Sequence, residues 1–157
     1  MVPLTMLWLP ILVSAVLVFI ASNILWMMLP FWHSSDYKRL ADEQPMMNAL
    51  TPLSPGQYIF PWLDWKNATP ERKAELAKLP SGYMIVRGPG TFGFGKAIFL
   101  WFVYIVIVSV FVAYLTGRTV AAGTEYLLVF RVAGTAGTMA WALGSDIANS
   151  IWYGRPW

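Results

Sequence analysis

The chain has 157 residues, of which 57% are hydrophobic and only 12% are charged, and it contains no cysteine. Soluble domains carry about 25% charged residues, so this composition excludes an ordinary soluble domain. The lack of cysteine excludes disulfides, thiolate metal sites and cysteine nucleophiles. The net charge of +3 is small, and basic residues are mixed with acidic ones, so the sequence predicts no nucleic-acid partner.

Three apolar runs contain most of the hydrophobic residues. Residues 2–32 and 97–117 contain no charged side chain, and residues 126–144 contain only Arg131. A helix of about 20 apolar residues crosses a hydrocarbon layer about 30 Å thick. The sequence therefore predicts an all-α integral membrane protein, with three transmembrane helices and a small, mostly irregular cytoplasmic connection.

The first run, residues 1–32, is predicted to form an uncleaved anchor. We expect its helix to begin near Pro10 and to end near Pro30, because proline is tolerated in the first helical turn and disrupts later ones. A signal peptide would begin with basic residues and have a shorter apolar core, whereas here no Lys or Arg precedes Lys38.

Tryptophan side chains mark the expected membrane interfaces, where amphipathic rings gather. One lies before the first helix, two lie near the end of the first span, one lies near the start of the second, and one lies after the third. The predicted interface anchors are Trp8, Trp26, Trp32, Trp101 and Trp152.

The connection, residues 33–96, is too small for an independent enzyme domain. We expect one short helix over residues 70–79, with Thr69 as its N-cap and a proline at its first position. Residues 83–87 are a candidate strand, and residues 88–95 are glycine-rich and flexible.

Residues 90–96 match the G-x4-G-K core of a phosphate-binding loop. That loop needs Ser or Thr after its lysine to hold magnesium, and Ala97 occupies this position. No parallel sheet is expected to support the loop either. We therefore interpret the segment as a hinge that leads the chain into the second helix.

The second and third apolar runs are bounded by local helix signals. Gly117 is expected to end the second helix, and Thr124 is expected to cap the third, with Glu125 in its first turn. The predicted division is helix 1–32, connection 33–96, helix 97–117, external loop 118–125, helix 126–151 and cytoplasmic tail 152–157.

Basic residues predict the orientation, since they concentrate on the cytoplasmic side of membrane proteins. The connection 33–96 holds eight Lys or Arg residues and the tail adds Arg155, whereas the opposite side has only Arg118. We therefore expect the connection and the C-terminus in the cytoplasm and the N-terminus outside.

Arg131 is the intramembrane charge of the third helix. Its long side chain can reach the interface, or it can pair with an acid, a lipid headgroup or a neighbouring subunit. Charges within a membrane often serve transport or catalysis, which remains the alternative. Asp146 lies fifteen residues further on, about 22 Å along a helix, so the two cannot meet within this segment.

His33 is the only histidine and a weak candidate for cofactor binding. Imidazole can ligate a metal, a haem or a chlorophyll-type pigment, although a lone interfacial histidine is more often only a polar group at headgroup level. One histidine without cysteine is too few for a protein-only zinc site. We predict no metal and no bound cofactor.

Small residues recur at helical spacing along the third helix. Such a stripe lets two helix backbones approach closely, either within the chain or against another protein. The predicted helix-packing residues are Ala133, Ala136, Gly137, Ala140, Gly144 and Ala148.

Six segments of the chain carry a resemblance to known sequences. They are LPFWHSSDYKRL (29–40), SPGQYIFP (54–61), GKAIFLWFVY (95–104), FVAYLTGRT (111–119), FRVAGT (130–135) and SIWYGRPW (150–157). With these segments the chain resembles a family of small, uncharacterised bacterial multi-pass inner-membrane proteins. The resemblance covers nearly the whole chain and implies a bacterial cytoplasmic-membrane location, but no activity. Members of that family continue into a fourth apolar segment, whereas this sequence stops at Trp157.

Three functions follow from these features. The first is a non-catalytic accessory or scaffolding subunit of a larger membrane assembly, such as a photosynthetic or respiratory complex. Its partners would be membrane lipid and other integral subunits, with pigment or lipid contacts. The alternative is a small transporter or channel component that uses Arg131 and Asp146. A lipid-acting enzyme would need His33, Asp36 and Asp146 to converge. We favour the first function and expect no enzyme activity.

Overall fold

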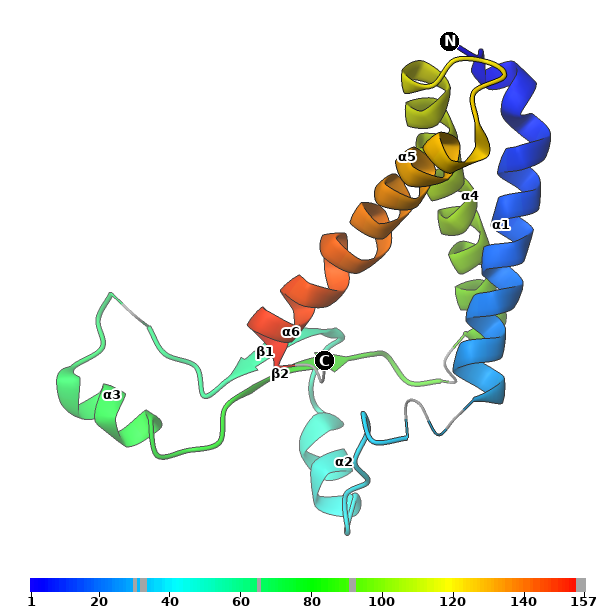
Figure 1. Cartoon of the computed structure of the whole chain (residues 1–157). Coiled ribbons are helices and arrows are strands. Elements are labelled where there is room, and N and C mark those ends of the chain that lie inside the picture. The colour runs from blue at the N-terminus through cyan, green and yellow to red at the C-terminus, as the bar shows by residue number, and fades with distance from the viewer. Residues whose placement is uncertain (30, 32–33, 65, 91–92, 155–157) are drawn as a thin grey trace. The chain divides into compact units, whose positions relative to one another are not determined.

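The computed structural model describes residues 1–29, 31, 34–64, 66–90 and 93–154 (Figure 1). The chain forms two compact units. The helical unit comprises Met1–Lys38 and Phe92–Trp157, and the hairpin unit comprises Arg39–Thr91.

The helical unit is built from three long helices, each long and apolar enough to cross a membrane. This confirms the three helices predicted from the apolar runs. The first long helix, Leu4–Met28, consists of a 3-10 turn η1 (Leu4–Leu7), α1 (Trp8–Asn23) and a π-helical end η2 (Ile24–Met28). The second is α4 (Phe94–Thr119). The third, Tyr126–Tyr153, joins α5 (Tyr126–Thr138), the π-helical η4 (Met139–Asp146) and α6 (Ile147–Tyr153).

The first long helix starts earlier than the prolines predict. Pro10 lies in the first turn of α1, where its missing N–H costs no hydrogen bond. A 3-10 turn precedes that turn, because Pro3 has an extended backbone and its carbonyl accepts from Met6 N at 3.0 Å. The predicted end at Pro30 lies outside the described residues.

Gly117 does not end the second helix, contrary to prediction. It is buried within α4, two residues before the helix ends at Thr119. The Gly117 carbonyl, which has no partner within its own helix this close to the end, accepts a hydrogen bond from Val2 N at 2.8 Å. The glycine is therefore a site of close approach between the two chain segments.

Thr124 does not cap the third helix either. Its hydroxyl donates to the carbonyl of Ala121 at 2.8 Å, so it closes the preceding turn. Glu125 occupies the N-cap position with an extended backbone, and α5 begins at the next residue. The acidic residue lies at the helix start, where the helix dipole favours negative charge.

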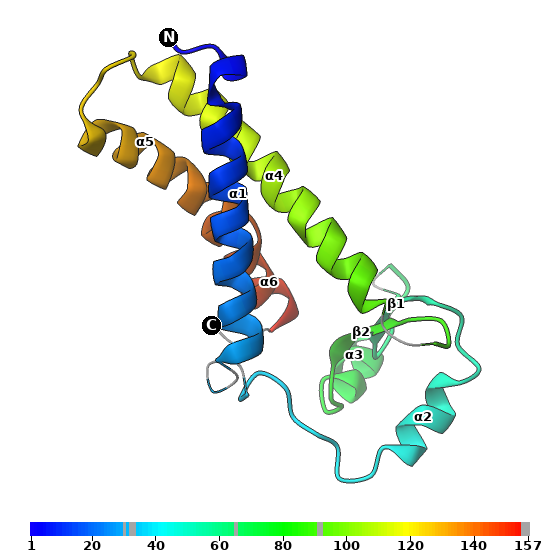
Figure 2. The same cartoon turned by 90° about the vertical axis from the view of Figure 1, so that its right-hand side faces the viewer.

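The first two long helices lie side by side and antiparallel, and the third crosses α4 and diverges from it toward its C-terminal end (Figures 1 and 2). The hydrogen bond between Val2 N and the Gly117 carbonyl places the start of the first helix beside the end of α4. Few of the described residues of this unit are buried. They are Ala15, Ile105, Val108, Gly117 and Val120.

The hairpin unit departs from the prediction of an all-α protein. Strands β1 (Gly56–Phe60) and β2 (Gly82–Val86) pair antiparallel, with Gly56 opposite Val86 and Phe60 opposite Gly82. The predicted strand at residues 83–87 is confirmed, and its partner β1 was not predicted. A helix α2 (Gln44–Leu50) adds to the one short helix expected.

The predicted short helix is present as α3 (Pro70–Leu76) and is capped as predicted. The Thr69 hydroxyl accepts from Arg72 N at 3.2 Å, which satisfies one of the free N–H groups of the first turn. The Glu71 carboxyl accepts hydrogen bonds from the backbone N–H of Glu71 and from the Thr69 side chain, and these lower the pKa of that carboxyl. The helix ends before the predicted residue Leu79.

Candidate functional site

An aromatic cluster joins the second and third long helices. The ring centroids of Trp101 and Trp141 lie 5.4 Å apart, and those of Tyr104 and Trp141 lie 5.2 Å apart, both in edge-to-face contact. Trp101 and Tyr104 come from successive turns of α4, and their ring centroids lie 5.7 Å apart. Such contacts stabilise a pair by about 0.5–1.5 kcal/mol beyond the burial of area. The cluster therefore anchors the third helix at this level.

The first long helix joins the same cluster through a hydrogen bond. Trp101 Nε1 donates to Ser22 Oγ at 3.1 Å, and that hydroxyl donates to the carbonyl of Phe19 at 2.9 Å. The Phe19 ring meets Phe102 edge to face, with centroids 5.3 Å apart. One residue of α4, Trp101, thus contacts both the first and the third helix.

An open, largely apolar groove lies between the first and second long helices, with a volume of about 320 Å³. The Asn23 amide on its wall donates to the carbonyl of Phe19 at 2.7 Å, so the groove keeps an apolar character. Its lining is Ser22, Asn23, Trp26, Met27, Phe94, Ile98 and Trp101.

A second open apolar groove of about 440 Å³ separates α4 from the third helix. Ala136, Met139 and Ala140 form one wall. The α4 wall carries larger apolar side chains, among them Val108, Phe111, Val112 and Leu115. We call this the α4–third-helix groove. The two alanines on one wall, opposite branched and aromatic side chains on the other, leave space for an apolar side chain or an acyl chain.

The predicted packing stripe faces this groove in part. Ala136 and Ala140 line it, and Ala133 and Gly137 are half-buried. A Cβ atom added at Gly137 would meet nothing within 4 Å, and one at Gly144 would meet only the Met139 carbonyl of its own helix. Ala148 is exposed. The stripe is therefore open along much of its length within this chain.

Two π-helical segments place side chains in these features. Trp26 and Met27 belong to η2 and line the first groove, while Trp141 belongs to η4 and completes the aromatic cluster. The wider turn of a π-helix shifts the angular position of every later side chain, and such segments often occur at functional sites. Apolar periodicity in the sequence does not reveal them.

Of the predicted candidates Arg131, Asp146 and His33, only Arg131 has a described side chain. Arg131 is exposed on α5. Asp146 follows fifteen residues later on the same continuous helix, and its side chain, like the whole of His33, lies outside the described residues. Among the described residues, no three His, Asp or Glu side chains gather as metal ligands.

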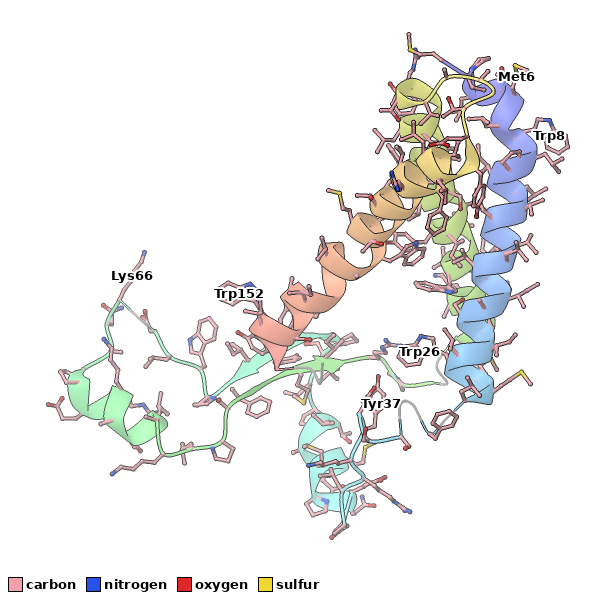
Figure 3. The ribbon with its side chains drawn as sticks, viewed as in Figure 1. Met6, Trp8, Trp26, Tyr37, Lys66 and Trp152 are labelled. Atoms are coloured by element: carbon pink, nitrogen blue, oxygen red, sulfur yellow. The ribbon has the colours of Figure 1, made fainter. Side chains whose placement is uncertain are left out.

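The tryptophans predicted as interface anchors differ in their surroundings. Trp8 and Trp26 are exposed near opposite ends of the first long helix, and Trp152 is exposed near the end of the third (Figure 3). Trp101 instead packs between helices, as described above. Trp32 lies outside the described residues.

Sequence reasoning missed the role of Trp141. A serine within a membrane helix, such as Ser22, is expected to hydrogen-bond to another helix, but its partner Trp101 was not predicted. The spacing of Trp101 and Tyr104 places two aromatic rings on neighbouring positions of one helix face, which is a usable signal. The hydrogen bond between Ser22 and Trp101 joins positions 79 residues apart, and no local pattern indicates it.

Comparison with protein-family models, with curated proteins and with solved structures found no match.

Proposed function

We propose that this chain is a multi-pass membrane protein that serves as a non-catalytic accessory subunit of a larger membrane assembly. The observation that carries the proposal is the α4–third-helix groove, with the small-residue stripe open beside it. Close approach of small residues is a main source of helix association within lipid, where the hydrophobic effect contributes little. A partner helix is the occupant that such a surface suits.

Membrane insertion is supported by the exposed side chains of the long helices. Trp8 and Trp26 are 18 residues apart on the first long helix, which is about 27 Å along its axis. This distance matches the hydrocarbon thickness of a bilayer, about 30 Å, with an aromatic ring at each interface. Between them, Leu12, Val13 and Leu17 are exposed. These side chains need an apolar solvent.

The orientation is part of the proposal. Because the first two long helices are antiparallel, both ends of the segment between them lie on the same side of the membrane. That segment carries eight Lys or Arg residues, which favours the cytoplasmic side. The resemblance to bacterial inner-membrane proteins supports the bacterial cytoplasmic membrane as the location.

The test is a substitution that fills the α4–third-helix groove and removes no existing contact. Ala136→Leu adds an apolar side chain to the wall of the α4–third-helix groove, whose volume of about 440 Å³ accommodates it. We expect the wild-type chain to migrate with a larger species on native gels after extraction in mild detergent, and the variant to lose that species.

The matched control is Thr135→Leu, which adds a similar side chain at the neighbouring, exposed position of α5. It should leave the larger species intact. A wild-type chain that migrates as a lone monomer in every mild detergent would contradict the proposal, and so would equal effects of the two substitutions.

A further inference from the structure

The two-stranded sheet of the hairpin unit has two unlike faces. Residues paired across an antiparallel sheet share a face, so Ile59 and Tyr83 lie on the same one. Ile85, opposite Gln57, lies on that face as well, because side chains alternate along a strand. We call the side formed by Ile59, Tyr83 and Ile85 the outer face. Gln57 is the polar residue of the outer face, and the other strand residues, including Tyr58 and Met84, form the opposite face.

The outer face is the more exposed of the two. Exposed fractions are 42% for Ile59, 55% for Tyr83 and 65% for Ile85. Met84 and Tyr58 pair with each other on the opposite face, and both are half-buried. Phe60, also on that opposite face, is 43% exposed, and its ring lies across Gly82, where an added Cβ would come within 2.9 Å of it. An isolated two-stranded sheet is marginally stable in water, so a surface that covers the outer face would stabilise it.

Chain connectivity restricts which surface is within reach. Val86, the last residue of β2, is eight residues before Phe94, where α4 begins. Eight extended residues span at most about 28 Å. If α4 crosses a membrane, as the proposed function states, the sheet is held within that distance of the lipid headgroups. A tether of this length raises the effective concentration of the membrane surface at the sheet.

The chemistry of the outer face suits the boundary between headgroups and acyl chains. Tyrosine and tryptophan rings concentrate at this depth, and Trp62, which closely follows β1, is 74% exposed. None of the ten strand residues is charged, and Arg87 follows β2 directly. The hairpin unit carries six basic and five acidic residues, a net charge of only +1, so apolar contact rather than charge would drive docking.

We propose that the outer face of the β1–β2 sheet lies on the lipid surface of the membrane that anchors both ends of the hairpin unit, with Ile59, Tyr83 and Ile85 at the headgroup–acyl boundary. This inference rests on the membrane insertion stated in the proposed function. A protein partner on the same face is the competing outcome that the experiment distinguishes.

The test uses the full chain in lipid nanodiscs and its lack of native cysteine. A single cysteine at Ile85, Met84 or Leu17 carries an environment-sensitive fluorophore, and nitroxide-labelled lipids serve as quenchers. Leu17 reports on the first long helix, where it is 60% exposed. Ile85 and Met84 are neighbours on opposite faces of one strand. We expect quenching and blue-shifted emission at Leu17 and Ile85, and neither at Met84.

The results at the three labelled positions separate failure of the outer-face proposal from failure of membrane insertion. Quenching at Leu17 without quenching at Ile85 overturns the outer-face proposal while membrane insertion stands, whether or not a protein covers the face. No quenching at Leu17 overturns insertion itself. Equal quenching at Ile85 and Met84 also contradicts the proposal, because it removes the difference between the two faces.

A second variant tests the driving force. With the fluorophore at Ile59, Ile85→Asp should lower the ratio of docked to undocked sheet about tenfold or more, since it removes one large apolar side chain from the contact. Ser81→Asp, an exposed change outside the strands, should leave the ratio unchanged. A ratio that falls with added salt but not with Ile85→Asp would contradict docking by apolar contact.

Discussion

In the helical unit, large apolar side chains are exposed around the helices, whereas in the hairpin unit three exposed ones share one face of a small sheet. Leu12, Val13 and Val18 are all exposed, although they point in different directions around α1. Ile59, Tyr83 and Ile85 point the same way. A surface that is apolar all round needs a solvent that encloses it, such as lipid. A surface that is apolar on one face needs only a flat boundary.

The two units also differ in what holds them together. The helical unit relies on aromatic contacts and a few close approaches, centred on Trp101 and Gly117. The hairpin unit relies on backbone pairing and on local side-chain caps, such as those of Thr69 and Asp64. Substitutions in the first should loosen helix packing, and substitutions in the second should act locally.

The largest effect is expected from Trp141→Ala. It removes the edge-to-face contacts with Trp101 and Tyr104, at about 0.5–1.5 kcal/mol each, so the free energy of unfolding should fall by about 1–3 kcal/mol. Detergent-driven unfolding of the purified chain in mixed micelles measures this. Trp152→Ala is the control, because that ring is 72% exposed. Equal losses from both changes would contradict the role given to the cluster.

Gly117→Ala should have the next largest effect. An added Cβ would come within 2.8 Å of the Val2 carbonyl oxygen and 3.1 Å of Leu7 Cδ1, so the start of the first helix must move. Overpacking of this kind costs about 1–3 kcal/mol, of which the better helix propensity of alanine recovers about 1 kcal/mol.

Gly134→Ala is the matched control for that change, since a Cβ there meets nothing within 4 Å. It should stabilise the same unit by up to about 1 kcal/mol in the same unfolding assay. If both substitutions shift stability in the same direction, the close approach at Gly117 is not a determinant of packing.

Ser22→Ala should weaken the contact between the first helix and Trp101 by a smaller amount. Hydrogen bonds between helices in a membrane contribute about 0.6 kcal/mol on average. Ser14→Ala provides the comparison, because Ser14 Oγ donates only to the Ile11 carbonyl of its own helix in the described contacts. A double-mutant cycle with Trp101→Phe should show coupling for Ser22 and none for Ser14.

The smallest effect belongs to the hairpin unit and depends on pH. Hydrogen bonds from the Asn67 side chain and from Lys66 N lower the pKa of Asp64 below its ordinary value of 3.8. The folded-state pKa is the lower one, so the stabilisation is present above about pH 4. It is lost as the pH falls through the folded value. Titration of the Asp64 carboxyl by NMR should show the lowered pKa, and Asn67→Ala should raise it.

Much of the fold could be predicted from the sequence, because its signals are local. Apolar runs with at most one charged residue, long enough to cross a bilayer, indicate the long helices, and Thr69 followed by a proline indicates α3. The strand β1 lacks such a signal, since Pro55 and Pro61 flank a segment too short to show alternation. Its pairing with β2 depends on residues more than twenty positions away.

The candidate site could be predicted only in part. The small residues from Ala133 to Ala148 are visible in the sequence, but the groove they line depends on how α4 and the third helix cross. The π-helical turn that carries Trp141 changes the register that an ideal helix would give, so the contact with Trp101 is not predictable from spacing.

Accessibility of single cysteines in intact cells tests the central claim most directly, since the chain has none of its own. Ala122 lies in the turn between α4 and α5, and Ser81 lies between α3 and β2; both are exposed. If the long helices cross the membrane with the hairpin unit inside, a membrane-impermeant maleimide should label Ala122→Cys in intact cells and Ser81→Cys only after permeabilisation. Labelling of Ser81→Cys as readily as Ala122→Cys in intact cells would contradict the account.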